Sequence, residues 1–304
     1  DLLGPAVAAI CRRKRLPYVV EPIGMFLPIV RNFRLKRMYH LLLGGPLLRG
    51  ASALIATSEQ EVEELAAGGL AREKIVMRPN GVAAPATWPV PGVFRDRHGI
   101  PREAKVALFL GRLSTKKSPD LLLNAFAKLP ARLGEKEVHL LFIGPDEGGV
   151  RGALKRATAQ LSLASRDLSA RVHFGAAIFG DDKWAAYRDA DVFVLPSQNE
   201  NFGNTAAEAV ISGTPVVVTE QCGIAPLLKD RAGLVVQHDA AELAEALTRV
   251  LTDAQLNESL RAACPVVAAE LGWDAPVSQM EELYERIIAQ RVAAKAAAAP
   301  VPLE

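Results

Sequence analysis

The sequence predicts an α/β fold made of two domains with parallel sheets. Short, β-branched apolar runs alternate with helical segments along most of the 304 residues, which is the order of repeated βαβ units. Polar loops that contain glycine follow several of these apolar runs, at the end where ligands bind in open α/β sheets. A stretch rich in proline, residues 85–92, separates an amino-terminal part from a carboxyl-terminal part and predicts a linker.

The composition fits a globular protein with two cores. Half of the residues are hydrophobic, 23% are charged, and the mean hydropathy is +0.13. The sequence has no run of 18 apolar residues, so we predict no membrane-spanning segment. Cys11, Cys222 and Cys264 are scattered without metal-type spacing, which is typical of a reducing cytosol. We therefore expect a cytoplasmic protein with no metal site.

The amino-terminal part, residues 1–90, is predicted to hold only a few βα units. The expected elements are a helix over 2–15 and strands over 18–20, 53–57 and 74–78. Ser58 and Glu61 have the spacing of a capping box, which predicts a helix that begins at that point.

The excess of positive over negative charge lies in this amino-terminal part. Residues 1–90 hold 12 Lys and Arg against 7 Asp and Glu, whereas residues 91–304 hold 24 against 27. The basic residues form two clusters, Arg12–Arg15 and a second one at Arg31, Arg34, Lys36 and Arg37. Solvated helix faces are one interpretation of these clusters. Peripheral contact with an anionic membrane, at its inner face, or with a lipid diphosphate is the other.

The carboxyl-terminal part, residues 91–290, opens with a strand, a basic loop and a helix. The predicted elements are a strand over 106–110, a loop over 111–120, a helix over 121–129 and a strand over 139–143. The loop carries Arg112 and Lys117, with Lys116 as a lesser candidate. An arginine fork and a lysine point charge at a strand end would stabilise an anion, and placement on an ordinary surface is the alternative.

The remaining elements continue the alternation. Helices are expected over 151–163, 181–190, 239–251, 253–264 and 276–288, and strands over 172–175, 191–195, 216–218 and 233–236. The loop over 144–149 lacks the Gly-x-Gly-x-x-Gly pattern, which disfavours a dinucleotide dehydrogenase. Trp184 and Tyr187 are predicted to be core residues rather than a stacking platform. Residues 291–304, rich in alanine and proline, are expected to form a disordered tail.

The most informative stretch follows the strand over 191–195. It places Glu200 and Glu208 eight positions apart, with Phe202–Thr205 between them, and Gly213-Thr-Pro215 ends the helix that begins there. The free N–H groups of Gly203, Asn204 and Thr205 open the helix and can hold a diphosphate. Two carboxylates beside it can accept hydrogen bonds from sugar hydroxyls. A capped helix with two solvated glutamates is the alternative.

This stretch resembles a known family. The pattern Pro-Ser-x3-Glu-x-Phe-Gly-x4-Glu-Ala-x3-Gly-x-Pro-Val-Val, from Pro196 to Val217, is similar to the Glu-x7-Glu signature of family-four retaining glycosyltransferases. The resemblance covers about residues 17–290 and implies the GT-B fold, with two Rossmann-like domains facing a cleft. It also implies a nucleoside-diphosphate-sugar as co-substrate, with no separate cofactor.

The resemblance assigns roles residue by residue. Arg112 and Lys117 would bind the diphosphate and assist its departure, Glu200 would contact the donor sugar, and Glu208 would hold the ribose. The other donor-binding positions that it implies are Gly111, Gly175, Ala176, Ile178, Asn201, Phe202, Gly203, Asn204 and Thr205. Cys222 follows the same rim, and we assign it no catalytic role.

Three departures from the family pattern stand out. The family's amino-terminal domain begins with a strand and several βα units that precede anything seen here, so we expect that domain to be truncated. Ile23 precedes Gly24 where many relatives have a catalytic histidine, and a hydrocarbon cannot shuttle a proton. Glu21 is a candidate substitute. Ser118 follows Lys117 where the family usually has glycine.

We therefore predict a retaining, metal-independent glycosyltransferase, acting in cell-surface glycan synthesis. The expected partners are a nucleotide-sugar donor and a glycan or lipid-linked acceptor, and no nucleic acid. A nucleotide-sugar-binding module without turnover is the main alternative, because the amino-terminal domain is expected to be incomplete. A sugar-nucleotide epimerase is a weaker one, and it would form product without an acceptor.

Overall fold

The computed structural model describes residues 2–24, 38, 40–163 and 168–297, and these fall into two compact units. Unit 1 comprises residues 1–81 and 273–304, and unit 2 comprises residues 82–272. We expected a boundary at 90 and counted the last helix with the carboxyl-terminal domain, although the family resemblance implies that this helix crosses back to the amino-terminal domain. The structure instead groups the segment 82–90 with unit 2 and the last helix with unit 1. Arg31, Arg34, Lys36 and Arg37 lie outside the described residues.

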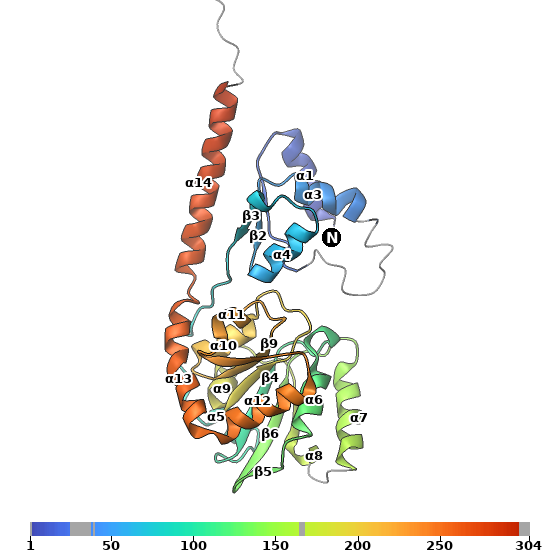
Figure 1. The fold of residues 1–304 in the computed structure, drawn as a ribbon, viewed down its shortest axis with the longest axis vertical. Coiled ribbons are helices and arrows are strands. Elements are labelled where there is room, and N and C mark those ends of the chain that lie inside the picture. Colours follow the sequence, from blue (N-terminus) through green and yellow to red (C-terminus); the bar gives the residue numbers. More distant parts are fainter. Residues whose placement is uncertain (1, 25–37, 39, 164–167, 298–304) are drawn as a thin grey trace, which may run out of the picture. The chain divides into compact units, whose positions relative to one another are not determined.

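Unit 1 is built on a small parallel sheet (Figure 1). Its elements are α1 (Leu3–Arg13), β1 (Val19–Val20), the π-helical turn η1 (His40–Gly44), α3 (Gly45–Arg49), β2 (Ala53–Ala56), α4 (Glu59–Ala67), the short 3₁₀ turn η2 (Arg72–Lys74), β3 (Ile75–Met77) and α14 (Asp274–Ala297). The strands pair in the order β1-β2-β3. The predicted capping box is confirmed in part, since the Ser58 hydroxyl accepts a hydrogen bond from the Glu61 N–H at 3.2 Å.

The sheet of unit 1 has a hydrophobic cluster on each face. Leu54 and Ala56 pack with Val62 and Leu65 of α4, whereas Ala53 and Ile55 pack with Leu283 of α14. Alternate residues of β2 thus face opposite clusters, as the period of a strand requires. Because α14 runs to Ala297, residues 291–297 are helical, and the expected disordered tail over 291–304 is wrong for that segment. The helix has good formers there, including a run of alanines.

Unit 2 has the alternation of strands and helices that the sequence predicts. Its elements are α5 (Val93–Arg97), β4 (Lys105–Leu110), the 3₁₀ turn η3 (Thr115–Lys117), α6 (Pro119–Phe126), β5 (Arg132–Leu133), β6 (Lys136–Ile143), α7 (Val150–Ser162), α8 (Leu168–Arg171), β7 (Val172–Gly175), α9 (Gly180–Asp189), β8 (Val192–Leu195), α10 (Asn204–Ile211), β9 (Val216–Thr219), α11 (Ala225–Leu228), β10 (Gly233–Val236), α12 (Ala240–Thr252) and α13 (Ala254–Ala269).

The sheet of unit 2 is doubly wound. Its parallel strands lie in the order β7-β6-β4-β8-β9-β10, and β5 is antiparallel to the start of β6. After β4 the chain adds strands on one side, and from β8 onward it adds them on the other. The direction of winding therefore reverses between β4 and β8, and in open α/β sheets ligands bind outside the carboxyl ends of the strands at such a point.

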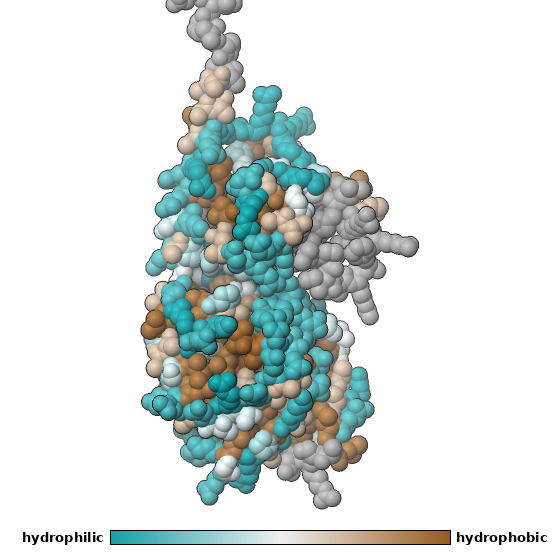
Figure 2. Space-filling model, in the orientation of Figure 1, coloured by the Kyte–Doolittle hydropathy of each residue, from teal (hydrophilic) through white to brown (hydrophobic). Residues whose placement is uncertain are grey.

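Helices cover both faces of this sheet. Val106, Leu108 and Leu110 of β4 belong to a cluster with residues of α9, α10 and α13, whereas Ala107 and Phe109 belong to a cluster with residues of α6, α7 and α12. Burial of a parallel strand on both faces explains why these strands are apolar without alternation. Figure 2 shows a hydrophobic area in the middle of the visible face of unit 2, with hydrophilic side chains around it.

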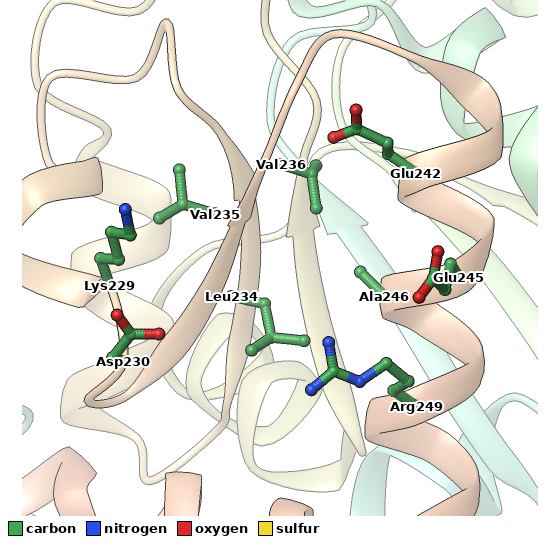
Figure 3. A pocket seen from close by; sticks show the side chains of 9 residues that line it. All are labelled: Lys229, Asp230, Leu234, Val235, Val236, Glu242, Glu245, Ala246 and Arg249. Carbon is green, nitrogen blue, oxygen red and sulfur yellow. The ribbon is translucent and has the colours of Figure 1, made fainter.

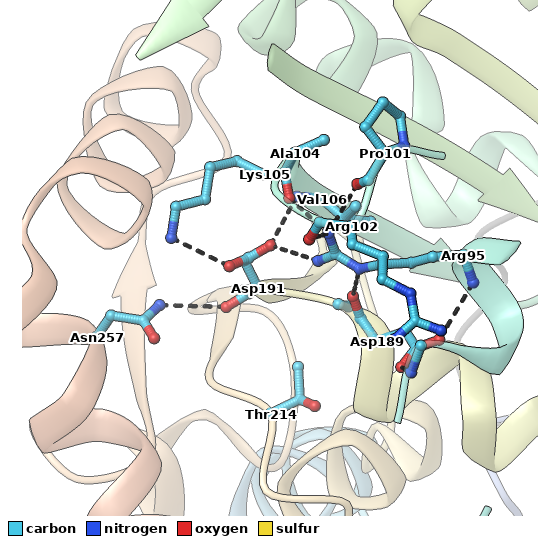
Figure 4. Close-up of polar contacts among 12 residues, drawn as sticks. Arg95, Pro101, Arg102, Ala104, Lys105, Val106, Asp189, Asp191, Thr214 and Asn257 are labelled. Carbon is cyan, nitrogen blue, oxygen red and sulfur yellow. Dashed lines mark hydrogen bonds and ion pairs between the residues drawn. The ribbon is translucent and has the colours of Figure 1, made fainter. Parts of the chain in front are cut away.

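A buried polar network lies at the amino end of the sheet (Figure 4). The Asp191 carboxylate, just before β8, pairs with Arg95 at 2.8 Å and with Lys105 at 3.1 Å. The Asp189 carboxylate accepts a hydrogen bond from the Phe94 N–H at 2.8 Å and so caps α5. Arg95 is only 9% exposed. These contacts fix α5 on the sheet and satisfy the buried charges.

No helix among the described residues is long and apolar enough to cross a membrane.

Candidate active site

The loops after β4 and β8 meet where the sheet changes its direction of winding. Lys117, at the end of η3, places its Nζ 2.7 Å from Oε2 of Glu200, and their side chains are only 15% and 21% exposed. The main chain joins the same two loops, because the Gln198 N–H donates to the Lys116 carbonyl at 3.0 Å. The structure therefore brings two of the predicted catalytic residues into contact at the expected edge of the sheet.

The turn that carries Lys117 is held in place by a histidine from another loop. Ser118 has a left-handed backbone, with φ +46° and ψ +50°, which glycine adopts without strain and serine does not. Its hydroxyl lies 2.9 Å from Nε2 of His238, and the side chain is buried. We did not predict this contact from the sequence. It holds a serine at a position where the family usually has glycine.

Glu200 is fixed through its main chain. Its N–H donates to the Gln221 carbonyl at 3.0 Å, and its carbonyl accepts from the Gly223 N–H at 2.8 Å. These two bonds form an isolated parallel bridge between Glu200 and Cys222. The loop after β8 is thus fastened to the loop after β9, which leaves the Glu200 side chain at a fixed point of the sheet's carboxyl edge.

Helix α10 begins at a glycine. Gly203 is its N-cap residue and, having no side chain, cannot itself cap the first turn. Its φ of +109° is left-handed, and a Cβ there would lie 2.9 Å from Cγ2 of Ile224, so glycine is required at this position. The N–H groups at the start of the helix are the ones predicted to hold an anion.

Buried polar atoms without a hydrogen-bond partner gather around the same loop. Among the described residues they include Ser197 Oγ, Asn201 Nδ2, Thr205 Oγ1 and Gln221 Oε1. In native proteins most buried polar atoms have a partner, so each of these needs one. Their concentration beside Glu200 and the start of α10 indicates a place built to receive a polar ligand.

Glu208 lies one turn into α10 and is held by helix α9. Its Oε1 pairs with Nζ of Lys183 at 2.7 Å, and its Oε2 accepts a hydrogen bond from the Tyr187 hydroxyl at 2.9 Å. Burial, and to a smaller extent the nearby Glu208 charge, raise the pKa of Tyr187 well above its usual value, so the hydroxyl remains a donor. Glu208, the residue predicted to hold the ribose, thus has two partners in α9 that we did not predict.

Arg112, the second predicted cation of the site, contacts neither Glu200 nor Glu208. Its guanidinium pairs with Glu147 at 3.2 Å, and its side chain is 68% exposed. Glu147 belongs to the loop after β6, so this arginine still lies at the carboxyl end of the sheet. The structure therefore holds Lys117 with Glu200, and it holds Arg112 and Glu208 in separate ion pairs.

Three neighbouring strands end at glycines. Gly111 follows β4, Gly144 follows β6, and Gly175 ends β7. A Cβ on Gly144 would lie 1.8 Å from the carbonyl oxygen of Gly111, a distance that no arrangement of side chains can relieve. Of the other predicted donor-binding residues, Ala176 is exposed, and Ile178 is partly buried against the core.

Other aromatic and thiol groups near the site are part of the core. Phe202 is 5% exposed, and Trp184 and Tyr187 are buried, which confirms the prediction that the latter two are core residues. Burial raises the pKa of the Cys222 thiol to about 11, so it is protonated near neutral pH and is not a nucleophile.

In unit 1, polar groups also follow the strand ends. Glu21, the candidate substitute for the family's histidine, follows β1 and forms an ion pair with the buried Arg78, which follows β3. Glu61 accepts a hydrogen bond from the Gly24 N–H at 2.7 Å. These contacts fix the loop that holds Ile23, and they place Glu21 beside a cation rather than in an apolar pocket.

A pocket of about 340 Å³ lies elsewhere, beside the edge strand β10 (Figure 3). Its charged lining residues are Lys229, Asp230, Glu242, Glu245 and Arg249. It includes none of the predicted donor-binding residues and flanks the side of the sheet rather than the carboxyl ends of its strands. The candidate site is therefore the cluster of polar groups at the carboxyl edge of the sheet, and this pocket is not part of it.

Two models of known families match this chain, one for each of its parts. The model of glycosyl transferases group 1 matches residues 93–265, and that of the glycosyl transferase 4-like domain matches residues 1–81. A D-inositol 3-phosphate glycosyltransferase from Corynebacterium jeikeium is 32% identical over 249 residues, which are 79% of this chain and 59% of the relative. One from Salinispora arenicola is 36% identical over 201 residues, 64% of this chain and 44% of the relative. The chain thus spans about half the length of these curated relatives.

Solved structures share the fold. Sucrose-phosphate synthase from Thermosynechococcus elongatus superposes with a TM-score of 0.76 at 25% identity, covering 93% of this chain and 72% of that one. Anabaena Alr3699/HepE, in complex with UDP and glucose, superposes with a TM-score of 0.77 at 20% identity, covering 91% and 74%. The expected GT-B fold is thereby confirmed.

Proposed function

The chain belongs to the glycosyl transferases group 1 family, and on that premise we propose that it moves a sugar from a nucleoside-diphosphate-sugar to an acceptor hydroxyl. The bond between the anomeric carbon and the diphosphate oxygen breaks, a bond to the acceptor oxygen forms, and the acceptor releases its proton. The observation that carries this proposal is the meeting of Lys117, Glu200 and the start of α10 at the point where the sheet changes its winding.

The diphosphate is the group that this place suits. The N–H groups at the start of α10 and the nearby cation Lys117 both favour negative charge. Negative charge grows on the diphosphate as the sugar leaves, so a fixed cation there stabilises the transition state more than the ground state. Arg112, exposed at the same edge, would exchange Glu147 for the diphosphate.

Glu200 and Glu208 suit the two sugars of the donor. Their carboxylate oxygens accept hydrogen bonds, and each sugar hydroxyl has one hydrogen bond to donate. We assign the transferred sugar to Glu200, which already lies beside Lys117, and the ribose to Glu208 in α10. The family resemblance implies the same order, together with retention of configuration and a reaction that needs no metal.

The names of the relatives suggest the donor and the acceptor. HepE is bound to UDP-glucose in one structure, which favours a nucleotide-sugar donor. Relatives named for D-inositol 3-phosphate make a phosphorylated polyol an acceptor to test beside a glycan or lipid-linked acceptor. We retain synthesis of cell-surface glycans as the proposed biological role.

The basic end of α1 supports a peripheral membrane contact in unit 1. Leu3, Val7 and Ile10, spaced along one side of the helix, are 68%, 48% and 55% exposed, and Arg12 and Arg13 follow in its last turn. Apolar groups next to basic ones are the composition of a helix that binds an anionic bilayer surface. Sedimentation with phosphatidylglycerol vesicles, but not with phosphatidylcholine vesicles, is the expected result; equal binding to both would contradict this contact.

A single set of measurements tests the main proposal. Calorimetric titration with UDP-, GDP- and ADP-sugars identifies the donor, and release of the nucleoside diphosphate with and without acceptors measures transfer. We expect release that depends on an acceptor and is unchanged by EDTA. Binding without release would instead identify a nucleotide-sugar-binding module, and failure of every nucleotide sugar to bind would refute the proposed function.

A further inference from the structure

Glu208 is gripped from two sides by one face of α9. Lys183 and Tyr187 are four positions apart in this helix, so their side chains lie one above the other on the same face. Each takes one oxygen of the carboxylate, Lys183 at 2.7 Å and Tyr187 at 2.9 Å. The orientation of the carboxylate plane is therefore set by two donors from a helix other than its own.

The Tyr187 hydroxyl is an immobile donor. The residue is fully buried, and its ring packs edge-on against Phe193 at 5.5 Å and tilted against Trp184 at 6.2 Å between ring centroids. A buried hydroxyl needs a hydrogen-bond partner, and Glu208 is the partner that the structure gives it. Rotation of Glu208 away from this position would leave the hydroxyl unsatisfied.

Lys183 supplies the counter-charge. Its Nζ lies 4.4 Å from the centre of the Trp184 ring, and the face of an aromatic ring attracts a cation. Its side chain is 23% exposed and that of Glu208 is 18% exposed. The carboxylate is largely removed from water, and Lys183 and Tyr187 supply two of the hydrogen-bond donors that it needs there.

The remaining acceptor capacity of Glu208 matches a diol. A carboxylate offers about four lone-pair sites, two on each oxygen. Among the described residues, Lys183 and Tyr187 contact the carboxylate and occupy one site on each oxygen, which leaves one site on each oxygen. Two adjacent acceptors at that spacing suit two hydroxyls on neighbouring carbons, as in the 2′,3′-diol of a ribose.

We propose that Lys183 and Tyr187 are positioning residues that orient Glu208 to read the ribose 2′,3′-diol, so that the protein selects ribonucleotides over their deoxy forms. The proposal rests on the proposed function, because it takes the ligand of Glu208 to be the ribose of the donor. Neither residue touches the reacting atoms. Each acts through Glu208, and its removal should therefore change the reading of hydroxyls more than the binding of the diphosphate.

The experiment is a calorimetric comparison of a nucleoside diphosphate with its 2′-deoxy and 3′-deoxy forms. The nucleotide is whichever of UDP, GDP and ADP binds the full chain most tightly. We expect the unaltered protein to lose about tenfold in affinity for each missing hydroxyl, the size of a hydrogen bond to a charged group. In Tyr187→Phe and Lys183→Met the ribonucleotide should weaken about tenfold. The ratio is the dissociation constant of a deoxy form divided by that of the ribonucleotide. In both variants this ratio should fall toward the value measured for Glu208→Ala.

Controls separate positioning from folding. Lys155→Met removes another lysine that lies over an aromatic ring, Phe174 at 5.8 Å, and it should leave the ratio unchanged. Lys183 is partly exposed, so Lys183→Met tests the proposal even where Tyr187→Phe lowers the melting temperature. Adding Tyr187→Phe to Glu208→Ala should cost no further affinity, because the two residues act as one unit.

The outcomes are distinct. A ratio that stays at the unaltered value in both Lys183→Met and Tyr187→Phe overturns the positioning role while the proposed function stands. Failure of the unaltered protein to bind any of the nucleotides refutes the proposed function and this inference with it. A reduced ratio that Lys155→Met does not share supports the inference.

Discussion

The two ends of the sheet in unit 2 treat their charged groups in opposite ways. At the amino end, Asp189 and Asp191 are surrounded by Arg95, Lys105 and main-chain N–H groups, and these donors satisfy the buried carboxylates. At the carboxyl end, Lys117 and Glu200 pair at 2.7 Å while polar atoms such as Asn201 Nδ2 and Thr205 Oγ1 are buried without partners.

This difference separates groups that stabilise the fold from groups that we propose to bind a ligand. In a satisfied network each buried charge has a protein partner in place of water, so loss of one partner destabilises the native state. Buried polar groups without partners lower the stability of the native state, and a ligand that supplies the missing partners raises that stability when it binds. Substitutions at the amino end should therefore change stability, and those at the carboxyl end should change binding and turnover.

The largest effect is expected from Asp191→Asn at the amino end. This change leaves Arg95 and Lys105, which are 11% and 23% exposed at their side chains, without their counter-charge. Breaking a buried ion pair from one side costs about 3–5 kcal/mol of unfolding free energy. Urea unfolding measures the loss, and nucleotide affinity below the melting temperature should be unchanged.

Asp182→Asn is the matched control for this change. Asp182 pairs with Arg97 in the same unit, but the two side chains are 52% and 59% exposed. Exposed pairs contribute about 0–1 kcal/mol, so the variant should unfold almost as the unaltered protein does. Equal losses in both variants would show that burial of the network does not matter.

The next effect is expected from Lys117→Ala at the carboxyl end. Loss of a fixed charge that stabilises the leaving group lowers kcat by about 10²–10³-fold. Thermal unfolding should shift little, in contrast to Asp191→Asn, and steady-state kinetics measure the difference. Lys116→Ala, the neighbouring lysine, serves as control and should keep most of the activity.

Arg112→Ala should also lower turnover, by less than Lys117→Ala, because Arg112 is exposed and must first leave Glu147. Kinetics in which neither variant slows the reaction would remove both cations from the mechanism and reduce the carboxyl end to a structural feature.

A smaller effect is expected from Glu208→Ala. The change removes the acceptor for the ribose hydroxyls, and hydrogen bonds to a charged group contribute about 1.5–3 kcal/mol. The dissociation constant of the nucleotide, measured by calorimetry, should rise accordingly. Glu245→Ala alters the pocket beside β10 in the same way, and weaker nucleotide binding in that variant would place the site in the wrong part of unit 2.

The smallest effect is a pH dependence of stability from two histidines. Nδ1 of His139 in β6 and Nε2 of His173 in β7 lie 2.9 Å apart, one as donor and the other as acceptor. Burial is the main reason that the pKa of each histidine is lowered. For His139, the charges of Arg171 and Arg95 lower the pKa further, and Glu137 raises it in part. For His173, the charge of His139 lowers the pKa further. The folded state therefore binds these protons more weakly than the unfolded state does.

The sign follows from this difference in proton affinity. Stability should be constant above about pH 6.5, the value for an unfolded histidine, and should fall as the pH drops below it. Urea midpoints at pH 7.5 and pH 5.5 measure the loss. His173→Gln, which keeps a polar group that cannot titrate, should lose less between the two values than the unaltered protein; an identical loss would assign the dependence to other groups.

Much of the fold and part of the site could be predicted from local patterns. Apolar runs such as Val106–Leu110 and Val192–Leu195 are buried on both faces, so their composition alone marks them as central strands. Glu200, Gly203 and Glu208 lie within one motif, and Lys117 follows a strand end, so topology places them at one edge.

The contacts that were missed join residues far apart in the chain. His238 reaches Ser118 from a loop 120 positions later, and Lys183 and Tyr187 reach Glu208 from the preceding helix. Such contacts depend on how helices dock on the sheet, which sequence periodicity does not specify. The same limit explains α14, whose grouping with unit 1 through Leu283 is a tertiary choice that local patterns do not reveal.

The close approach of Gly144 to the Gly111 carbonyl limits how this protein could be redesigned. A carbon placed there would lie 1.8 Å from that oxygen, so no other residue fits at position 144 unless the main chain moves. A substitution at Gly144 would therefore disturb the main chain, whereas α9 and α10 carry the side chains of Lys183, Tyr187 and Glu208, which can be exchanged. Mutant libraries aimed at a different nucleotide are best directed to those helices.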